Sequence, residues 1–432
     1  MKLSCRYFAY LTLLATSSLA AAVELREGQY GDVLLFPFYT VENNWDTYLN
    51  VAGAGSRGRV LVLRFRAGED GREVRTLSVY SRRAEAFRAS LSRDAAGNAQ
   101  MTIAEGECVI DEQLMPGGVG SSYAIEARTG LIEVYSVGQT YVDCAEALEN
   151  WQPGGVWQTD PYEDIRNLGT EYEVGGELIL VNVAEGLSAS YPATVLGNFA
   201  EQMPHTLPGS ASPNLADADP LLHYPESDPV SVPTAKGIDA VAQVIARNLV
   251  RLGNDVIVSP EIGARTDWVV TYPLQGYKNY KYFAIETGET TEYCENFGGG
   301  SLDGDEPVIV DALDGPYPLE AWSAGRSNLY AEPTPRPTLA LAAGMCRAVN
   351  VVSFAGQAPI LVPESSALRT APGLELEDVE SYQLRWFPLA QSPYYPPILG
   401  FRLTTFQNGR LDGGTLANYA ILQAHRREVA AE

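Results

Sequence analysis

The sequence has little lysine and little histidine, and it carries none of the common catalytic motifs. Only four of its 30 basic residues are lysines, and its three histidines are His205, His223 and His425. Two of them fall in a proline-rich segment and one in the charged C-terminal stretch, which predicts poorly ordered surroundings. The HExxH, GxSxG and GxxxxGKS/T patterns do not occur. The sequence therefore favours a protein that is not an enzyme and holds no cofactor.

Long apolar runs are also missing after the first 22 residues. Lys2 and Arg6 precede an apolar stretch over residues 7–15, and three alanines follow at 20–22. This order is typical of a signal peptide, and the stretch is about half the roughly 20 residues that a spanning helix needs. We expect cleavage near Ala22 and no membrane span afterwards. The mature chain is then secreted or held at the cell surface, with the periplasm as the alternative.

Positive charge is scarce as well. The formal net charge is −24, and loss of the leader with its two cations lowers it by two more. A surface this acidic repels nucleic acid and anionic lipid, so we expect neither as a partner. The excess of acids also accounts for solubility outside the cell.

Cysteine is rare, and its number is informative. Cys5 lies in the leader, which leaves Cys108, Cys144, Cys294 and Cys346. An even number in an exported chain predicts disulfides. Three pairings are open, and the spacing favours Cys108 with Cys144 and Cys294 with Cys346. Each bridge would add about 3–4 kcal/mol of stability by the loop-entropy estimate. No close-spaced CxxC pair is present, which disfavours a metal bound by cysteines.

Short alternating segments dominate the rest of the chain and predict a mainly β fold. Residues 59–66 place Leu61, Leu63 and Phe65 on one face and the intervening side chains on the other. We predict a hairpin from residues 47–51 and 59–66, and an edge or a bend at Pro37 in the strand 33–39. Further strands are expected at 74–80, 131–135, 177–183, 187–191, 266–272, 280–285, 307–310, 349–354 and 401–406.

Few helices are expected. The best has Ile238, Val241, Ile245, Leu249 and Leu252 at helical spacing, with a glycine after the last. A shorter helix is predicted at residues 145–151. The prolines between residues 200 and 236 indicate either an interdomain linker or a loop on one domain. We predict two β-sandwich-like domains: leader 1–22, N-terminal domain 23–199, connector 200–236 and C-terminal domain 237–432.

Three motifs could indicate a binding site, but each also has a simpler structural explanation. Residues 53–58 match GxGxxG, but a strand rather than a helix follows, so we read a glycine-rich turn. The acidic turn at residues 301–306, near Asp303, has the oxygen atoms that Ca²⁺ prefers without EF-hand spacing, and metal binding there stays open. Tyrosines at 277, 280, 282, 394 and 395 favour strand packing over ligand stacking.

Five blocks resemble a family of secreted proteobacterial proteins often labelled cell-surface proteins. They are GDVLLFPFYTV at 31–41, VLRFR at 62–66 before REV at 72–74, GARTDWVVTYP at 263–273, CRAVNVVSF at 346–354 and GGTLANY at 413–419. The resemblance implies a location at the cell surface and no catalytic residues. In the third block, Trp268 and Arg265 fall on opposite faces of a strand, and Asp267 would pair with Arg265 or bind a neighbouring loop.

These observations favour a non-enzymatic surface or matrix protein that acts by interaction, through adhesion, envelope structure or assembly with like subunits. Its partner would be a protein or polysaccharide of the cell surface, and a homo-oligomer is compatible with the sequence. The alternative is a secreted protein that binds or cleaves polysaccharide, because two catalytic carboxylates leave no sequence signature.

Overall fold

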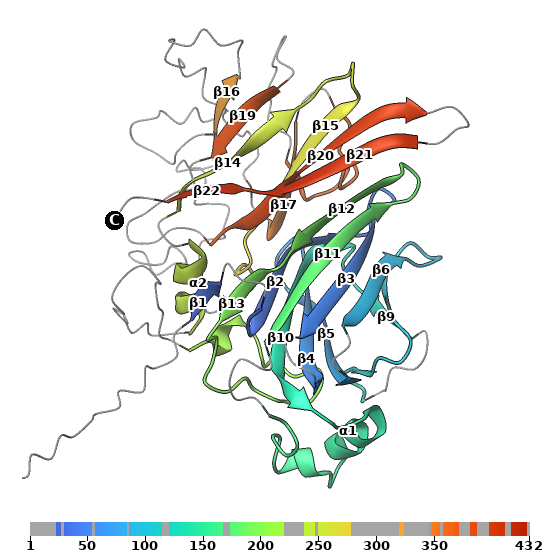
Figure 1. Cartoon of the computed structure of the whole chain (residues 1–432), viewed down its shortest axis with the longest axis vertical. Coiled ribbons are helices and arrows are strands. Elements are labelled where there is room, and N and C mark those ends of the chain that lie inside the picture. Colours follow the sequence, from blue (N-terminus) through green and yellow to red (C-terminus); the bar gives the residue numbers. More distant parts are fainter. Residues whose placement is uncertain are drawn as a thin grey trace, which may run out of the picture.

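The computed structural model defines two groups of β-sheets. It describes residues 23–26, 30–53, 57–83, 86–114, 121–166, 173–219, 237–246, 249–277, 319–323, 345, 347–354, 357–370, 381–386, 397–410 and 416–429. The fold is mainly β, as the alternating segments predicted. Figure 1 shows the N-terminal strands, in blue and green, below the C-terminal strands, in yellow and red.

The N-terminal half contains a seven-stranded and a six-stranded antiparallel sheet. The first has the order β1 (Glu24–Arg26), β13 (Thr194–Gly197), β2 (Val33–Thr40), β10 (Thr129–Thr140), β4 (Arg57–Ala67), β5 (Glu73–Arg83) and β8 (Val109–Ile110). The second has the order β12 (Leu187–Pro192), β11 (Val174–Asn182), β3 (Asp46–Gly53), β6 (Phe87–Arg93), β7 (Ala99–Ile103) and β9 (Ser122–Ile125).

The two sheets pack face to face around one hydrophobic core. On β4, Leu61, Leu63 and Phe65 join Leu49 and Leu91 of the six-stranded sheet in this core. Val60 and Val62 point the other way and belong to a second hydrophobic cluster on the outer side of the seven-stranded sheet. The predicted two faces of β4 are therefore confirmed, and both are buried.

The C-terminal half contains a four-stranded and a five-stranded sheet. The first has the order β16 (Leu319–Ser323), β19 (Ser381–Trp386), β14 (Leu249–Ile257) and β22 (Arg426–Val429). The second has the order β18 (Arg369–Thr370), β17 (Val349–Ser353), β15 (Ala264–Thr271), β20 (Leu399–Arg410) and β21 (Leu416–Ala424). All the pairs are antiparallel except β17 with β18.

The two halves share a core. Phe401 on β20 lies edge-on to Phe38 on β2, with ring centroids 5.8 Å apart, and 4.7 Å from the ring of Tyr191 on β12. The Thr271 hydroxyl donates a 2.7 Å hydrogen bond to the carbonyl of Pro37. The five-stranded sheet thus packs directly on the N-terminal sandwich.

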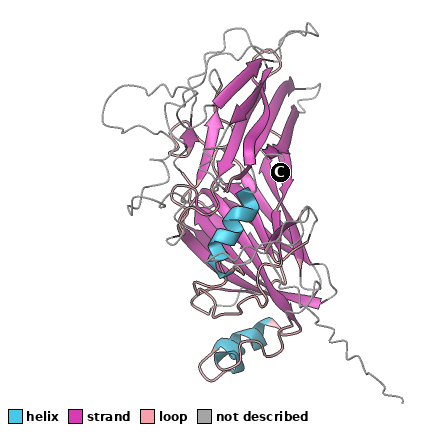
Figure 2. Cartoon of the chain, turned by 90° about the vertical axis from the view of Figure 1, so that its left-hand side faces the viewer, coloured by secondary structure: helices cyan, strands magenta, loops and turns pink. Residues whose placement is uncertain are grey.

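Helices and the first part of the connector cover the outer side of the seven-stranded sheet. Figure 2 shows α2 (Gly237–Ala246) against the strands and α1 (Cys144–Trp151) at the lower end. Two short 3-10 turns lie at Val156–Gln158 and Leu215–Asp217. The Arg64 guanidinium donates to the carbonyls of Ser210 and Pro213, so the described part of the connector packs on the sheet. Among the residues described, no helix has the length and apolar character needed to cross a membrane.

The predicted hairpin of residues 47–51 and 59–66 is wrong. Strand β3 pairs with β11 and β6, whereas β4 pairs with β10 and β5, so the chain crosses between the two sheets after Gly53. Burial explains the separation, because β3 alternates between buried and open residues while β4 is buried on both faces. A strand buried on both faces belongs in a sheet covered on both sides.

The strand containing Pro37 and the helix from Ile238 both depart in part from the prediction. Strand β2 lies inside its sheet rather than at an edge, but its pairing with β10 shifts register between Phe36 and Tyr39. The proline thus occupies the predicted bend. Helix α2 ends at Ala246, and Leu249 and Leu252 belong to β14. Pairing of β14 with both β19 and β22 overrides the helical spacing of those leucines.

Candidate functional site

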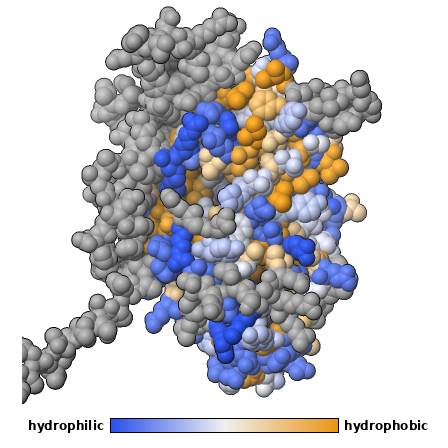
Figure 3. Space-filling view, viewed as in Figure 1, coloured by the Kyte–Doolittle hydropathy of each residue, from blue (hydrophilic) through white to orange (hydrophobic). Residues whose placement is uncertain are grey.

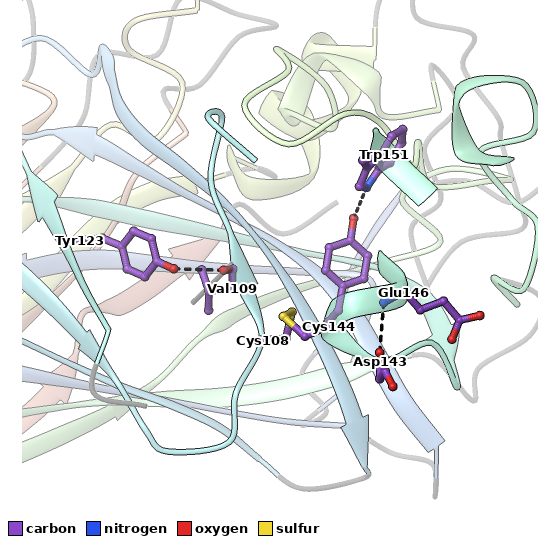
Figure 4. The surroundings of a disulfide bond; sticks show 8 residues. Cys108, Val109, Tyr123, Asp143, Cys144, Glu146 and Trp151 are labelled. Atoms are coloured by element: carbon purple, nitrogen blue, oxygen red, sulfur yellow. Dashed lines mark hydrogen bonds between the residues drawn. A yellow bond between two sulfur atoms is a disulfide. The ribbon is translucent and has the colours of Figure 1, made fainter. Parts of the chain in front are cut away.

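The disulfide Cys108–Cys144 joins the approach to β8 with the first residue of α1. The two Cα atoms are 5.3 Å apart. Beside the bridge, the Asp143 side chain accepts a hydrogen bond from the Glu146 amide and caps the helix (Figure 4). The first predicted bridge is therefore present. Cys294 and Cys346 lie outside the described residues.

A filled aromatic box surrounds His205 close to this bridge. The Trp151 indole donates to the Tyr80 hydroxyl oxygen at 2.7 Å, and that hydroxyl lies 3.2 Å from His205 Nε2. The single hydroxyl proton then points to Nε2, so Nδ1 carries the imidazole hydrogen and donates it to the carbonyl of Pro161. The Trp157 ring centroid lies 4.7 Å away. Burial lowers the pKa of His205 to about 4, which keeps the ring neutral.

The poorly ordered setting that we predicted for the histidines is wrong for two of them. Both His205 and His425 are buried, with 3% and 7% of their surfaces exposed. His425 lies against Trp268, and its Nε2 is 2.8 Å from the Val269 carbonyl. Their aromatic neighbours were distant in the sequence and gave no local signal. His223 lies outside the described residues.

A second polar cluster is centred on Glu133 beneath the connector. Its carboxylate receives the Arg66 Nε hydrogen at 2.5 Å and the hydroxyls of Tyr135 and Tyr277 at 2.8 and 2.9 Å. The Arg66 guanidinium lies 4.0 Å from the Tyr277 ring centroid, and the Leu215 amide donates to the Tyr277 hydroxyl. Burial opposes the charge of Arg66, but Glu133 outweighs it and raises the pKa of the guanidinium. The cluster ties the connector and the C-terminal half to the seven-stranded sheet.

The third cluster lies at the joint between the halves. Asp267 on β15 accepts the backbone N–H groups of Ile360 and Leu361 at 2.8 and 3.0 Å. The carbonyl of Ile360 in turn accepts from the Trp45 indole at 2.9 Å and the Asn43 amide at 3.3 Å. One loop is thus held from both halves. Burial raises the pKa of Asp267 to about 6, although the two N–H groups oppose the shift.

Of the two roles predicted for Asp267, pairing with Arg265 or binding a neighbouring loop, the structure shows the second. Arg265 instead forms an ion pair with Glu185, 3.1 Å away, at the turn between β11 and β12. Trp268 and Tyr272 are buried on the opposite face of β15, as predicted. The three polar clusters link separate parts of the fold. Protein groups hold the Glu133 carboxylate and both ring nitrogens of His205, whereas one oxygen of the buried Asp267 carboxylate has no hydrogen-bond partner among the described residues.

The outer face of the six-stranded sheet is different, because its side chains point away from the core. On β3, Thr47, Leu49 and Val51 are buried, while Tyr48 is 42% exposed. Tyr48 stands opposite Ile179 on β11 and Ser90 on β6. The same cross-strand row continues through residues with small or hydroxyl side chains: Ser190 on β12, Thr102 on β7 and Ser122 on β9. We call this row, with Asp46 and Asn50, the open face.

Two hydrogen-bond acceptors on the open face have no donor among the described residues. Asp46 makes no hydrogen bond or ion pair there, and burial alone raises the pKa of its carboxyl. The side-chain oxygen of Asn50 is buried without a partner. Figure 3 shows this side of the molecule as a mixture of hydrophilic and hydrophobic residues. The open face therefore offers the Asp46 carboxylate, several hydroxyls and one exposed aromatic ring, whereas the Asn50 oxygen is closed to solvent.

The other motifs contribute no further described site. Gly53 ends β3 and Gly58 lies in β4, so a strand follows GxGxxG as expected. Tyr277 is engaged with Glu133, whereas Tyr280, Tyr282, Tyr394, Tyr395 and the acidic turn near Asp303 lie outside the described residues. Within the described ranges, no three His, Cys, Asp or Glu side chains gather closely enough to hold a metal ion.

Two comparisons with known proteins found no match for this chain. No protein-family model matches it, and a search of the curated proteins found no match. The buried clusters and the open face are therefore the observations from which we propose a function.

Proposed function

We propose that this chain is an exported, non-enzymatic surface or matrix protein that acts by binding another surface component. The proposal rests on the contrast between the buried polar groups, which hold the fold together, and the solvent-facing side chains of the open face. Glu133, Asp267 and His205, the buried groups with the chemistry of catalysts, are each engaged in holding the fold. The open face presents polar side chains that do not hold the fold together.

Export is supported by the leader and by the Cys108–Cys144 bridge. Disulfides persist in oxidising compartments and are rare in the cytosol. The blocks that resemble secreted cell-surface proteins support the same location. Two of them form β2 and β15, whose packing joins the halves.

Expression of the tagged full chain in a Gram-negative host tests this proposal. We expect a mature protein that begins near residue 23, carries the disulfide and is digested by protease added to intact cells. An uncleaved chain in the cytosol with free thiols would contradict the proposal.

A further inference from the structure

We propose that the open face binds a neutral, extended polysaccharide, with Tyr48 as the stacking residue. This inference rests on the proposed function and names its partner. It follows from the shape, the hydrogen-bonding groups and the charge of the six-stranded sheet.

The shape suits a long, flat ligand. The register is unbroken in all five strand pairs of this sheet, whereas shifts occur at three pairings of the seven-stranded sheet. At a spacing of roughly 4.8 Å between strands, six strands give a surface about 24 Å wide. Tyr48 stands near its middle, between Ile179 and Ser90. A linear polymer can cross the strands along this row.

The hydrogen-bonding groups suit a ligand rich in hydroxyls. Asp46 and Asn50 lie on either side of Tyr48 on the same face of β3, and the partly exposed Asp46 carboxylate has no donor among the described residues. Serine and threonine hydroxyls along the row can donate or accept. Sugar hydroxyls supply both functions, and the tyrosine ring offers an apolar surface for the C–H face of a sugar.

The charge disfavours the other polymers. The row from Ser190 to Ser122 contains no ionised side chain. Beside the row, Asp46 is acidic, and Glu177 and Arg88 opposite Asn50 carry opposite charges. The whole chain has a formal charge of −24. Acidic polysaccharides and nucleic acids are repelled by such a protein. A protein partner would need an apolar centre with several aromatic anchors, and the row provides only Tyr48 and Ile179. A neutral polysaccharide fits all three properties.

The test is affinity electrophoresis and pull-down of the disulfide-bonded mature chain on cellulose, chitin, starch and mixed-linkage β-glucan, with alginate as the anionic polymer. We expect retention by at least one neutral polymer. Tyr48→Ala should weaken it about tenfold or more, whereas Tyr48→Phe should keep most of it. The matched control is Tyr419→Ala, because Tyr419 is 57% exposed on β21 and lies in a different sheet.

A second variant keeps the test valid if Tyr48→Ala fails to fold. Ser90→Arg places a bulky charge beside Tyr48 and should reduce retention at an unchanged melting temperature. The inference is overturned if no neutral polymer retains the wild type, if only alginate does, or if Tyr48→Ala and Ser90→Arg both bind like the wild type. Export and surface exposure are measured separately, so a correctly exported chain without retention refutes this inference alone.

Discussion

Asp267→Asn should raise the free energy of unfolding at neutral pH, because it removes a buried, ionised carboxylate between the two halves. The carboxylate of Asp267 is fully buried, and its main partners are two backbone N–H groups of the loop that Trp45 holds from the other side. Desolvation raises its pKa from 3.8 to about 6. An asparagine side chain keeps an oxygen acceptor for the loop and carries no charge.

The sign follows from proton linkage. As the pH falls through 6, the folded protein takes up a proton at Asp267 before the unfolded chain does, so this group's destabilising effect disappears towards pH 4. A shift of about two pH units corresponds to about 3 kcal/mol. We therefore expect the variant and the wild type to be similar below about pH 4, and the variant to gain up to about 3 kcal/mol relative to the wild type above pH 6.5.

Urea unfolding at a series of pH values, with the disulfide intact, measures this difference. The histidines titrate equally in both proteins and cancel from it. Asp94→Asn is the control, because hydrogen bonds to Asn98 lower the pKa of that exposed carboxyl and reverse the sign. A difference between Asp267→Asn and wild type that stays flat from pH 4.5 to 8 would refute the reasoning.

Three further predictions concern the other clusters. His205→Gln should flatten the acid dependence of stability, because the unfolded wild type is protonated below pH 6.5 while the folded pKa is about 4, a loss of about 3 kcal/mol that urea unfolding detects. Glu133→Gln should cost about 3–5 kcal/mol in the same assay, since Arg66 stays buried without its counter-charge; an unchanged midpoint would contradict this. Replacing Cys108 and Cys144 together by serine should cost about 3–4 kcal/mol, seen as a lower melting temperature, and reductant should lower the melting temperature of the wild type more than that of the variant.

Local sequence patterns predicted where the strands lie better than they predicted which strands pair with each other. The alternation in residues 59–66 gave the two faces of β4 correctly, and Trp268 and Tyr272 are buried as expected. The pairing of β3 with β11 and β6 was missed, because it depends on contacts more than a hundred residues apart on one side. Sequence neighbours favoured a hairpin that the burial of β4 excludes.

The candidate site was harder to find for the same reason. The outward position of Tyr48 was not predicted, and the row through Ile179 and Ser90 exists only once three strands are in register. The box around His205 is likewise assembled from distant segments. Cysteine spacing was the exception, since an even number of cysteines in an exported chain leaves few pairings.

The most direct test of the central claim is the rate at which a thiol-reactive maleimide labels Ser190→Cys in the exported protein, with Tyr419→Cys as reference. Ser190 lies on the row of the open face, opposite Ile179, and its replacement leaves the Tyr48 ring in place. Both positions are exposed, so both thiols should react quickly in the free protein. With a retaining neutral polysaccharide present, the account predicts that labelling at position 190 slows by about tenfold while labelling at position 419 is unchanged. Equal labelling at position 190 with and without saturating polysaccharide would contradict it.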